Sequence, residues 1–185
     1  MTDLDLCYLP ATDAIKQFKA KTLSPVELLD ALIRRAEEVE PVINAFTYRH
    51  FDEAMDKAKK AEAKYASGKR TRALEGLPIG IKDESFIKGK PTSSGSLIMK
   101  DFVADRTSVG NERIMRAGGI IHARTATPEF SAAFCTQSRL WGATRNPWNP
   151  EFTPGGSSGG TAASLAAGTS TIASGSDIAG SIRNP

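Results

Sequence analysis

The 185-residue sequence is poor in the residues that disulfide scaffolds and metal sites need, with two cysteines and two histidines. Cys7 and Cys135 lie far apart and form no C-x-x-C pair. We therefore expect neither a disulfide framework nor a zinc knuckle, and no metal or cofactor. This cysteine usage fits a reducing, cytoplasmic compartment.

Long hydrophobic runs are also missing, since no stretch approaches the roughly 18 apolar residues of a membrane span. The first residues, Met-Thr-Asp-Leu-Asp-Leu, lack the basic and apolar regions of a secretory signal. We therefore expect no membrane association.

Charge of one sign is scarce, because 24 Lys and Arg residues against 21 Asp and Glu residues give a net charge of +3. The basic residues between positions 57 and 72 have the acids Glu53, Asp56 and Glu62 among or beside them. We interpret this run as a solvated helix face, and we expect no nucleic-acid partner. A content of 40% hydrophobic and 24% charged residues is typical of a globular protein.

The first third of the chain has helical periodicity and turn signals. Helices are expected over residues 12–19, 24–41 and 52–66. The second begins at Ser24-Pro25-Val26-Glu27, where Ser24 can cap the helix and Glu27 can reach back to the cap amide. We expect Pro41 to end it. These helices make an amino-terminal helical segment, residues 1–73.

From residue 74 onward, short apolar strands alternate with helices. Strands are expected over residues 77–81, 119–123 and 169–173, and helices over 108–116 and 161–167. The alternation predicts α/β packing around a sheet. We assign residues 74–185 to this α/β core, which makes one domain with the helical segment.

Two glycine and serine clusters, residues 154–161 and 175–183, stand out from this core. A flexible linker would have the same composition, but it would not enclose a helix and an apolar strand. Glycines beside serines let backbone N–H groups point into one cavity, as an oxyanion site requires.

A nucleophilic serine also needs a base within hydrogen-bond reach. The two histidines, His50 in a loop and His122 in an expected buried strand, are interpreted as surface or packing residues. A lysine is the alternative base if burial or its neighbours lower its pKa towards neutrality.

Three motifs now coincide. They are Gly80-Ile-Lys-Asp83, Gly155-Gly-Ser-Ser-Gly-Gly160 and Gly175-Ser-Asp-Ile-Ala-Gly-Ser-Ile-Arg183. Together they resemble the amidase-signature family, and the spacings of 75 (157 − 82) and 24 (181 − 157) residues match a member of it. The segments 74–80 and 127–130 and the amino-terminal helices extend the resemblance over essentially the whole chain. It implies a mixed β-sheet covered by helices, incomplete in this chain.

The resemblance implies hydrolysis of a small carboxylic amide to an acid and an amine or ammonia, through a serine acyl-enzyme. Lys82 is then the base, Ser157 the bridging serine after a cis Gly156–Ser157 peptide, and Ser181 the nucleophile. The expected oxyanion donors are the backbone N–H groups of Ile178, Ala179, Gly180 and Ser181. The supporting residues are Ser158, Asp177 and Arg183. A homodimer is compatible with this reading.

The sequence departs from the usual family pattern at Ala179, which replaces a glycine, at Ala126, which replaces an asparagine, and at Asn184. The methyl group of Ala179 disfavours positive φ but leaves the N–H donor in place. Asn184 and the Ile-Ala-Gly of residues 178–180 favour a free-standing amidase. The alternative is the amidase subunit of a glutamine-dependent tRNA amidotransferase, which uses the same triad.

An alternative of another class is a non-catalytic module whose glycine loop binds an anion. The segment 155–161 lacks the G-x-x-x-x-G-K-[ST] order of a phosphate loop, and Lys82 would have no role. Pro185 lies four residues (185 − 181) after Ser181, so we expect the chain to be the amino-terminal portion of a longer protein.

Overall fold

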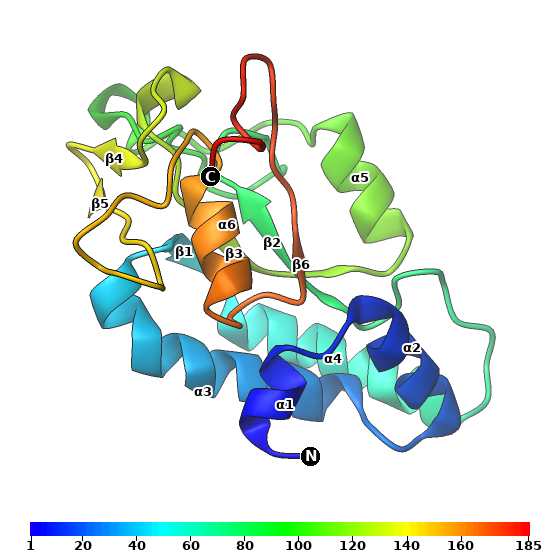
Figure 1. The fold of residues 1–185 in the computed structure, drawn as a ribbon. Helices are drawn as coiled ribbons and strands as arrows, with labels where there is room; N and C mark the ends of the chain where they lie inside the picture. Colours follow the sequence, from blue (N-terminus) through cyan, green and yellow to red (C-terminus); the bar gives the residue numbers. More distant parts are fainter.

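The computed structural model describes all residues, 1–185. Its helices and strands alternate along most of the chain (Figure 1). The helices are α1 (Asp3–Cys7), α2 (Ala11–Ala20), α3 (Pro25–Ile43), α4 (Phe51–Ala66), α5 (Val109–Arg116) and α6 (Gly159–Ala166), with short 3-10 turns η1 (Leu97–Met99) and η2 (Glu129–Ser131). The strands are β1 (Phe46–Arg49), β2 (Pro78–Lys82), β3 (Ile120–Thr125), β4 (Gln137–Ser138), β5 (Gly142–Ala143) and β6 (Ile172–Ala173). None of the helices is both long and apolar enough to cross a membrane.

The start of α3 is set by the local signal in the sequence. The Ser24 hydroxyl accepts a hydrogen bond from the Glu27 N–H at 3.1 Å, and the Glu27 carboxylate accepts one from the Ser24 N–H at 2.7 Å. This capping box satisfies two amides that a helix start otherwise leaves unpaired. The expected helix start is therefore confirmed, and the helices expected over 12–19 and 52–66 match α2 and α4.

The expected end of α3 at Pro41 is wrong, because the helix continues to Ile43. Pro41 lies in the last turn, so its missing N–H removes one hydrogen bond and the helix can close around it. Asn44 then takes a left-handed conformation (φ 48°) and donates its N–H to the Glu40 carbonyl at 3.0 Å. The left-handed residue, rather than the proline, ends the helix.

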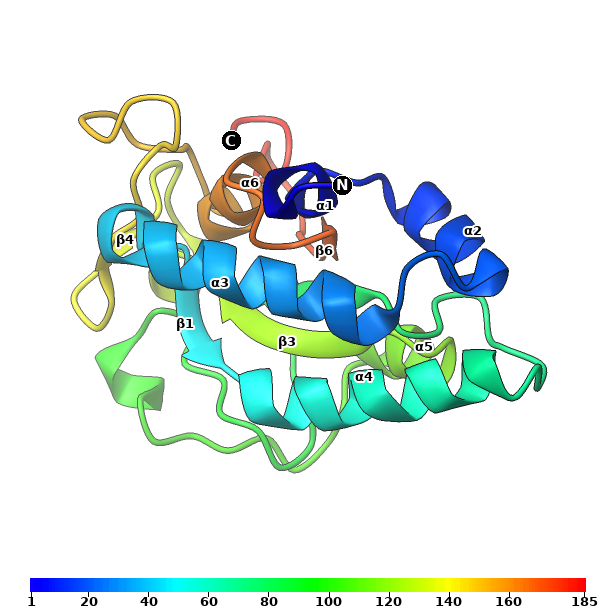
Figure 2. The same cartoon turned by 90° about the horizontal axis from the view of Figure 1, so that it is seen from below.

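Helix α3 is buried on two sides. Leu28 and Leu32 pack in a cluster with residues of α1, α2 and α4, whereas Leu29 packs with Ala54 and Ala58 of α4 and with β3. Figure 2 shows α3 and α4 lying side by side along the sheet. The apolar face of each helix thus joins the helical segment to the strands.

The main sheet has the strand order β1-β3-β2-β6. β2 is parallel to β3 and to β6, and β1 is antiparallel to β3, which confirms the expected mixed sheet. The strands expected over 77–81 and 119–123 match β2 and β3, but the one expected over 169–173 is reduced to Ile172–Ala173. The sequence analysis missed β1, which carries the sheet into residues 1–73.

Because β2, β3 and β6 are parallel, their carboxyl ends meet at one edge of the sheet. Lys82 pairs with Thr125 at the ends of β2 and β3, and the chain leaving β6 runs past them. Helix α6 begins at the same edge, where Gly160 lies so close to Ala126 that a Cβ on Gly160 would be 2.3 Å from its backbone nitrogen. The close approach requires glycine at position 160 and brings the first glycine cluster to this edge.

Candidate active site

Lys82 is the last residue of β2, and its side chain is only 1% exposed. Its backbone N–H donates to the Ser174 hydroxyl at 3.1 Å, which links β2 to the segment after β6. Its Nζ donates to the Ser157 hydroxyl at 2.7 Å and to the Ser176 hydroxyl at 2.9 Å. The structure therefore places one amine between the two glycine clusters.

Burial lowers the pKa of Lys82, because a charged amine loses its hydration inside the protein. The negative charges of Glu84 and Asp177 act in the opposite direction and offset part of this effect. An amine with a lowered pKa is neutral at a lower pH, and a neutral amine can accept a proton.

Ser157 is fully buried and lies just before α6, after a cis Gly156–Ser157 peptide, as the resemblance implied. The next residue, Ser158, ties the clusters together. Its hydroxyl accepts a hydrogen bond from the Ser176 N–H at 3.3 Å and lies 3.3 Å from the Ser176 carbonyl oxygen, to which it donates. Ser158 therefore positions the segment that carries Ser176 against the start of α6.

Ser181 lies beside this pair. Its carbonyl accepts a hydrogen bond from the Ser158 N–H at 3.0 Å. The side chains of Ser157 and Ser181 line one cavity of about 370 Å³, but no hydrogen bond joins their hydroxyl groups. The cavity is mostly apolar, and its other lining residues are Glu84, Phe130, Ser131, Ala132, Ala133, Phe134, Ser176, Ile178 and Ala179.

Asp177 orders the loop that carries Ser181. Its carboxylate accepts hydrogen bonds from the Gly180 N–H at 2.8 Å and the Ile182 N–H at 3.0 Å, and it pairs with the Arg183 guanidinium at 2.9 Å. Arg183, with the backbone donors, lowers the pKa of Asp177. Of the four expected oxyanion donors, Gly180 is thus committed to Asp177. The N–H groups of Ile178, Ala179 and Ser181 form no hydrogen bond within the protein.

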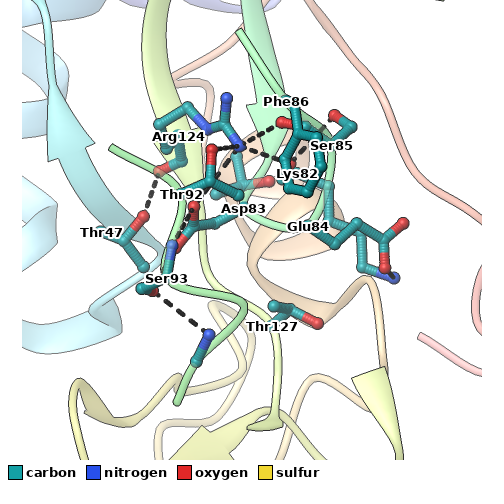
Figure 3. Close-up of polar contacts among 12 residues, drawn as sticks. Thr47, Lys82, Asp83, Glu84, Ser85, Phe86, Thr92, Ser93, Arg124 and Thr127 are labelled. Atoms are coloured by element: carbon teal, nitrogen blue, oxygen red, sulfur yellow. Dashed lines mark hydrogen bonds and ion pairs between the residues drawn. The ribbon is translucent and has the colours of Figure 1, made fainter. Parts of the chain in front are cut away.

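Arg124 of β3, which is completely buried, holds the loop after β2 in place (Figure 3). One terminal nitrogen, Nη2, donates to the Ser85 carbonyl at 2.6 Å and to the Lys82 carbonyl at 3.3 Å, and it lies 3.4 Å from the Asp83 carboxylate. Asp83, also buried, accepts further hydrogen bonds from Ser93. This network fixes the backbone that follows the Lys82 side chain.

Glu84 is a site residue that the sequence analysis did not identify. Its carboxylate lies 3.2 Å from Lys82 Nζ (Figure 3). It also accepts a hydrogen bond from the Ser131 hydroxyl. Its position two residues after the lysine was the available signal. Ser131, from η2, could not be found in this way, because it is 47 residues from Glu84 in the chain.

Both histidines lie outside this cavity. His122 is buried, its Nε2 is 2.9 Å from the Thr169 carbonyl, and its ring stacks on Phe51. Burial lowers the pKa of His50 and of His122 to about 4. The packing role expected of His122 fits these contacts. No group of three or more His, Cys, Asp or Glu side chains is placed to hold a metal ion.

Residues 27–185 match the family described as Amidase. The chain belongs to the amidase family. It is 39% identical over 170 residues to the A-type subunit of glutamyl-tRNA(Gln) amidotransferase from Synechococcus sp. (strain CC9605), and this match covers 92% of the chain and 35% of the relative.

Solved amidase-family structures share the fold. Fatty acid amide hydrolase superposes with a TM-score of 0.94 at 29% identity, over 100% of this chain and 33% of the other. The 6-aminohexanoate cyclic dimer hydrolase gives a TM-score of 0.85 at 33% identity, over 96% of this chain and 35% of the other. The chain therefore spans about a third of the length of the relatives it matches.

Proposed function

We propose that the protein hydrolyses a small carboxylic amide through an acyl-enzyme, with Ser181 as nucleophile, Ser157 as proton relay and Lys82 as base. The observation that carries the proposal is the 2.7 Å hydrogen bond between Lys82 Nζ and the Ser157 hydroxyl in a buried environment. The contact joins a buried amine to a buried hydroxyl group at the wall of the cavity that Ser181 also lines.

In this mechanism neutral Lys82 takes the proton of the Ser157 hydroxyl, while Ser157 takes the proton of Ser181. The Ser181 oxygen attacks the amide carbonyl and forms the tetrahedral intermediate. The proton then passes back through Ser157 to the leaving nitrogen, the C–N bond breaks, and water hydrolyses the ester. Catalytic hydrogen bonds of empty sites often tighten when substrate binds, so the Ser157–Ser181 contact is expected to form at that step.

The negative charge on the intermediate needs donors. The uncommitted N–H groups of Ile178, Ala179 and Ser181 are the available ones, and each well-placed donor is worth roughly 3–4 kcal/mol in the transition state. The Gly180 N–H joins them only if it leaves Asp177. Asp177 and Arg183 act by holding the loop in place.

A second candidate within the family is ammonia release from glutamine for a partner protein. It is favoured by the curated relatives, which are named as A-type subunits of glutamyl-tRNA(Gln) amidotransferase. Asn184 and the Ile-Ala-Gly segment favour a free-standing amidase, and so do the amidase and hydrolase names of the solved neighbours. Both candidates use the same serine chemistry.

The test is covalent labelling of the full-length protein with a fluorophosphonate, followed by peptide mass spectrometry. We expect one adduct on Ser181, lost in Ser181→Ala and retained in Ser67→Ala, which changes an exposed serine at the end of α4. A protein that does not react is a binding module rather than an amidase. Glutamine hydrolysis without activity on aryl, aliphatic or other amino-acid amides, together with copurifying subunits, selects the second candidate.

A further inference from the structure

Glu84 occupies a place that the proton relay does not use. Its carboxylate lies 3.2 Å from Lys82 Nζ, and Glu84 lines the same cavity as Ser157 and Ser181. The Ser131 hydroxyl donates to the same carboxylate and is itself 2.9 Å from the Thr127 hydroxyl. Ser131 of η2 thus holds the carboxylate of Glu84 in place. Glu84 itself lies in the loop after β2, where its carboxylate contacts the amine of Lys82.

We propose that Glu84 is a positioning residue for Lys82: it directs the amine towards Ser157 and stabilises the positive charge that Lys82 acquires when it takes the serine proton. The inference rests on the proposed role of Lys82 as base. Glu84 itself exchanges no proton with the substrate.

The physical reason is the burial of the amine. Lys82 is 1% exposed, so water cannot solvate the ammonium ion that forms during the reaction. An opposite charge within about 4–6 Å favours the charged form, and the effect is larger where water is excluded. Catalytic bases are commonly oriented by a third group in this way. Glu84 would perform that task for Lys82.

The other charges near Lys82 are already committed. They are Asp177, paired with Arg183 on the segment after β6, and Asp83, paired with Arg124 between β2 and β3. Arg124 contacts the carbonyl of Lys82 and not its amine. Glu84 is therefore the acid in direct contact with the amine.

The surroundings of Glu84 favour its ionised form. Burial alone would raise the pKa of Glu84, but hydrogen bonds from Ser131 and Ser176 and the charge of Lys82 lower it below its usual range. A permanently negative Glu84 raises the pKa of Lys82, which burial has lowered. The two effects set the pH at which the base becomes neutral.

The test compares Glu84→Gln with the wild type of the full-length protein across pH. The variant keeps the shape of the side chain and removes its charge. In the pH profile of kcat, we expect the maximal value reached at high pH to fall at least about tenfold. The limb over which kcat rises with pH should move to lower pH by about 1 pH unit or more. Glu84→Asp, which restores the charge, should return the limb towards its original position. A merely structural defect lowers kcat without moving the limb.

Two further variants serve as controls. Ser131→Ala keeps the carboxylate of Glu84 but removes the hydrogen bond that holds it. We therefore expect kcat to fall, with a smaller shift of the rising limb than in Glu84→Gln. Glu112→Gln removes an exposed carboxylate of α5 and should leave kcat and the position of the rising limb unchanged.

A second readout does not depend on turnover. The Lys82 Cε resonance of 13C-lysine-labelled protein, assigned with Lys82→Arg, should titrate at lower pH in Glu84→Gln than in the wild type. An unmoved limb and an unmoved Lys82 titration overturn the inference. A shifted titration in a protein that hydrolyses no amide supports the contact between the two residues and refutes the proposed function instead.

Discussion

The amine of Lys82 lies 2.7 Å from the hydroxyl oxygen of Ser157, although the two residues are 75 positions apart in the chain. The contact depends on two placements: Lys82 ends the central strand β2, and Ser157 precedes a helix that packs on β2 and β3. Buried amine and buried hydroxyl thus meet at the edge of the sheet where the cavity opens.

Replacement of Lys82 tests its role as base. Arginine is not deprotonated in proteins, so Lys82→Arg and Lys82→Ala should both lower kcat/KM by about 10²-fold or more. In the wild type, kcat/KM should rise with pH through a limb below 10.5, the ordinary pKa of lysine, because burial lowers the pKa of Lys82 and the neutral form is active. Lys88→Arg, at an exposed position, is the control. An active Lys82→Arg enzyme would contradict a proton-accepting role.

Arg124 is predicted to be important for stability because it neutralises Asp83 in the core. Both side chains are completely buried, and Arg124→Met leaves the carboxylate without its partner. Breaking a buried pair in this way costs about 3–5 kcal/mol. Arg116→Met removes an exposed pair on α5 and should change the free energy of unfolding by less than about 1 kcal/mol. Urea unfolding curves measure both, and similar values for the two variants would refute the prediction.

Gly160→Ala should displace the start of α6. The added Cβ would lie 2.3 Å from the Ala126 nitrogen, so helix or strand has to move, at a cost of about 1–3 kcal/mol in the free energy of unfolding. Gly110→Ala in α5 meets no atom within 4 Å and should be neutral or stabilise by up to about 1 kcal/mol. Thermal unfolding of the two variants provides the comparison. Equal midpoints would show that the contact at Ala126 is unimportant.

Glu75 is predicted to make stability depend on pH under acid conditions. Hydrogen bonds from Arg72, and then from Lys64, outweigh burial and lower the pKa of Glu75 from 4.5 to about 2. Because the folded pKa is the lower one, this stabilisation is present above pH 4.5 and is lost as the pH falls towards 2. Lowering the pKa of this buried carboxyl from 4.5 to about 2 corresponds to a stabilisation of roughly 3 kcal/mol.

Urea unfolding of Glu75→Gln at several pH values checks this. The variant should be less stable than the wild type at pH 7, and the difference should narrow below pH 4.5. A difference that is the same at pH 7 and at pH 3 would mean that packing, and not charge, explains the loss.

Elements with local causes could be predicted from the sequence. The cap at Ser24 and Glu27 lies within four residues, and it sets the start of α3 whatever packs against the helix. The predicted helix end at Pro41 was wrong because a proline in the last turn disrupts a helix less than a proline in the helix interior. Strand β1 was missed because it has four residues and depends on β3 for its hydrogen bonds.

The site divides in the same way. Lys82, Ser157 and Ser181 belong to short motifs, and the family resemblance implied their roles before any contact was known. The Asp83–Arg124 pair and the Glu84–Ser131 bond join segments 41 and 47 residues apart, and no motif links them. Contacts of this kind are set by the register of β2 against β3 and by the path that the chain takes after β3.

Part of the cavity wall comes from a segment that carries none of the three residues proposed for the relay. Residues 130–134 supply Phe130, Ser131, Ala132, Ala133 and Phe134 to the wall, whereas Lys82 ends β2, Ser157 precedes α6 and Ser181 lies in the loop after β6. Randomising this short segment should therefore change which amides the proposed site accepts. Ser131 is the exception and should be kept in such a library, because its hydroxyl donates to Glu84, which contacts Lys82.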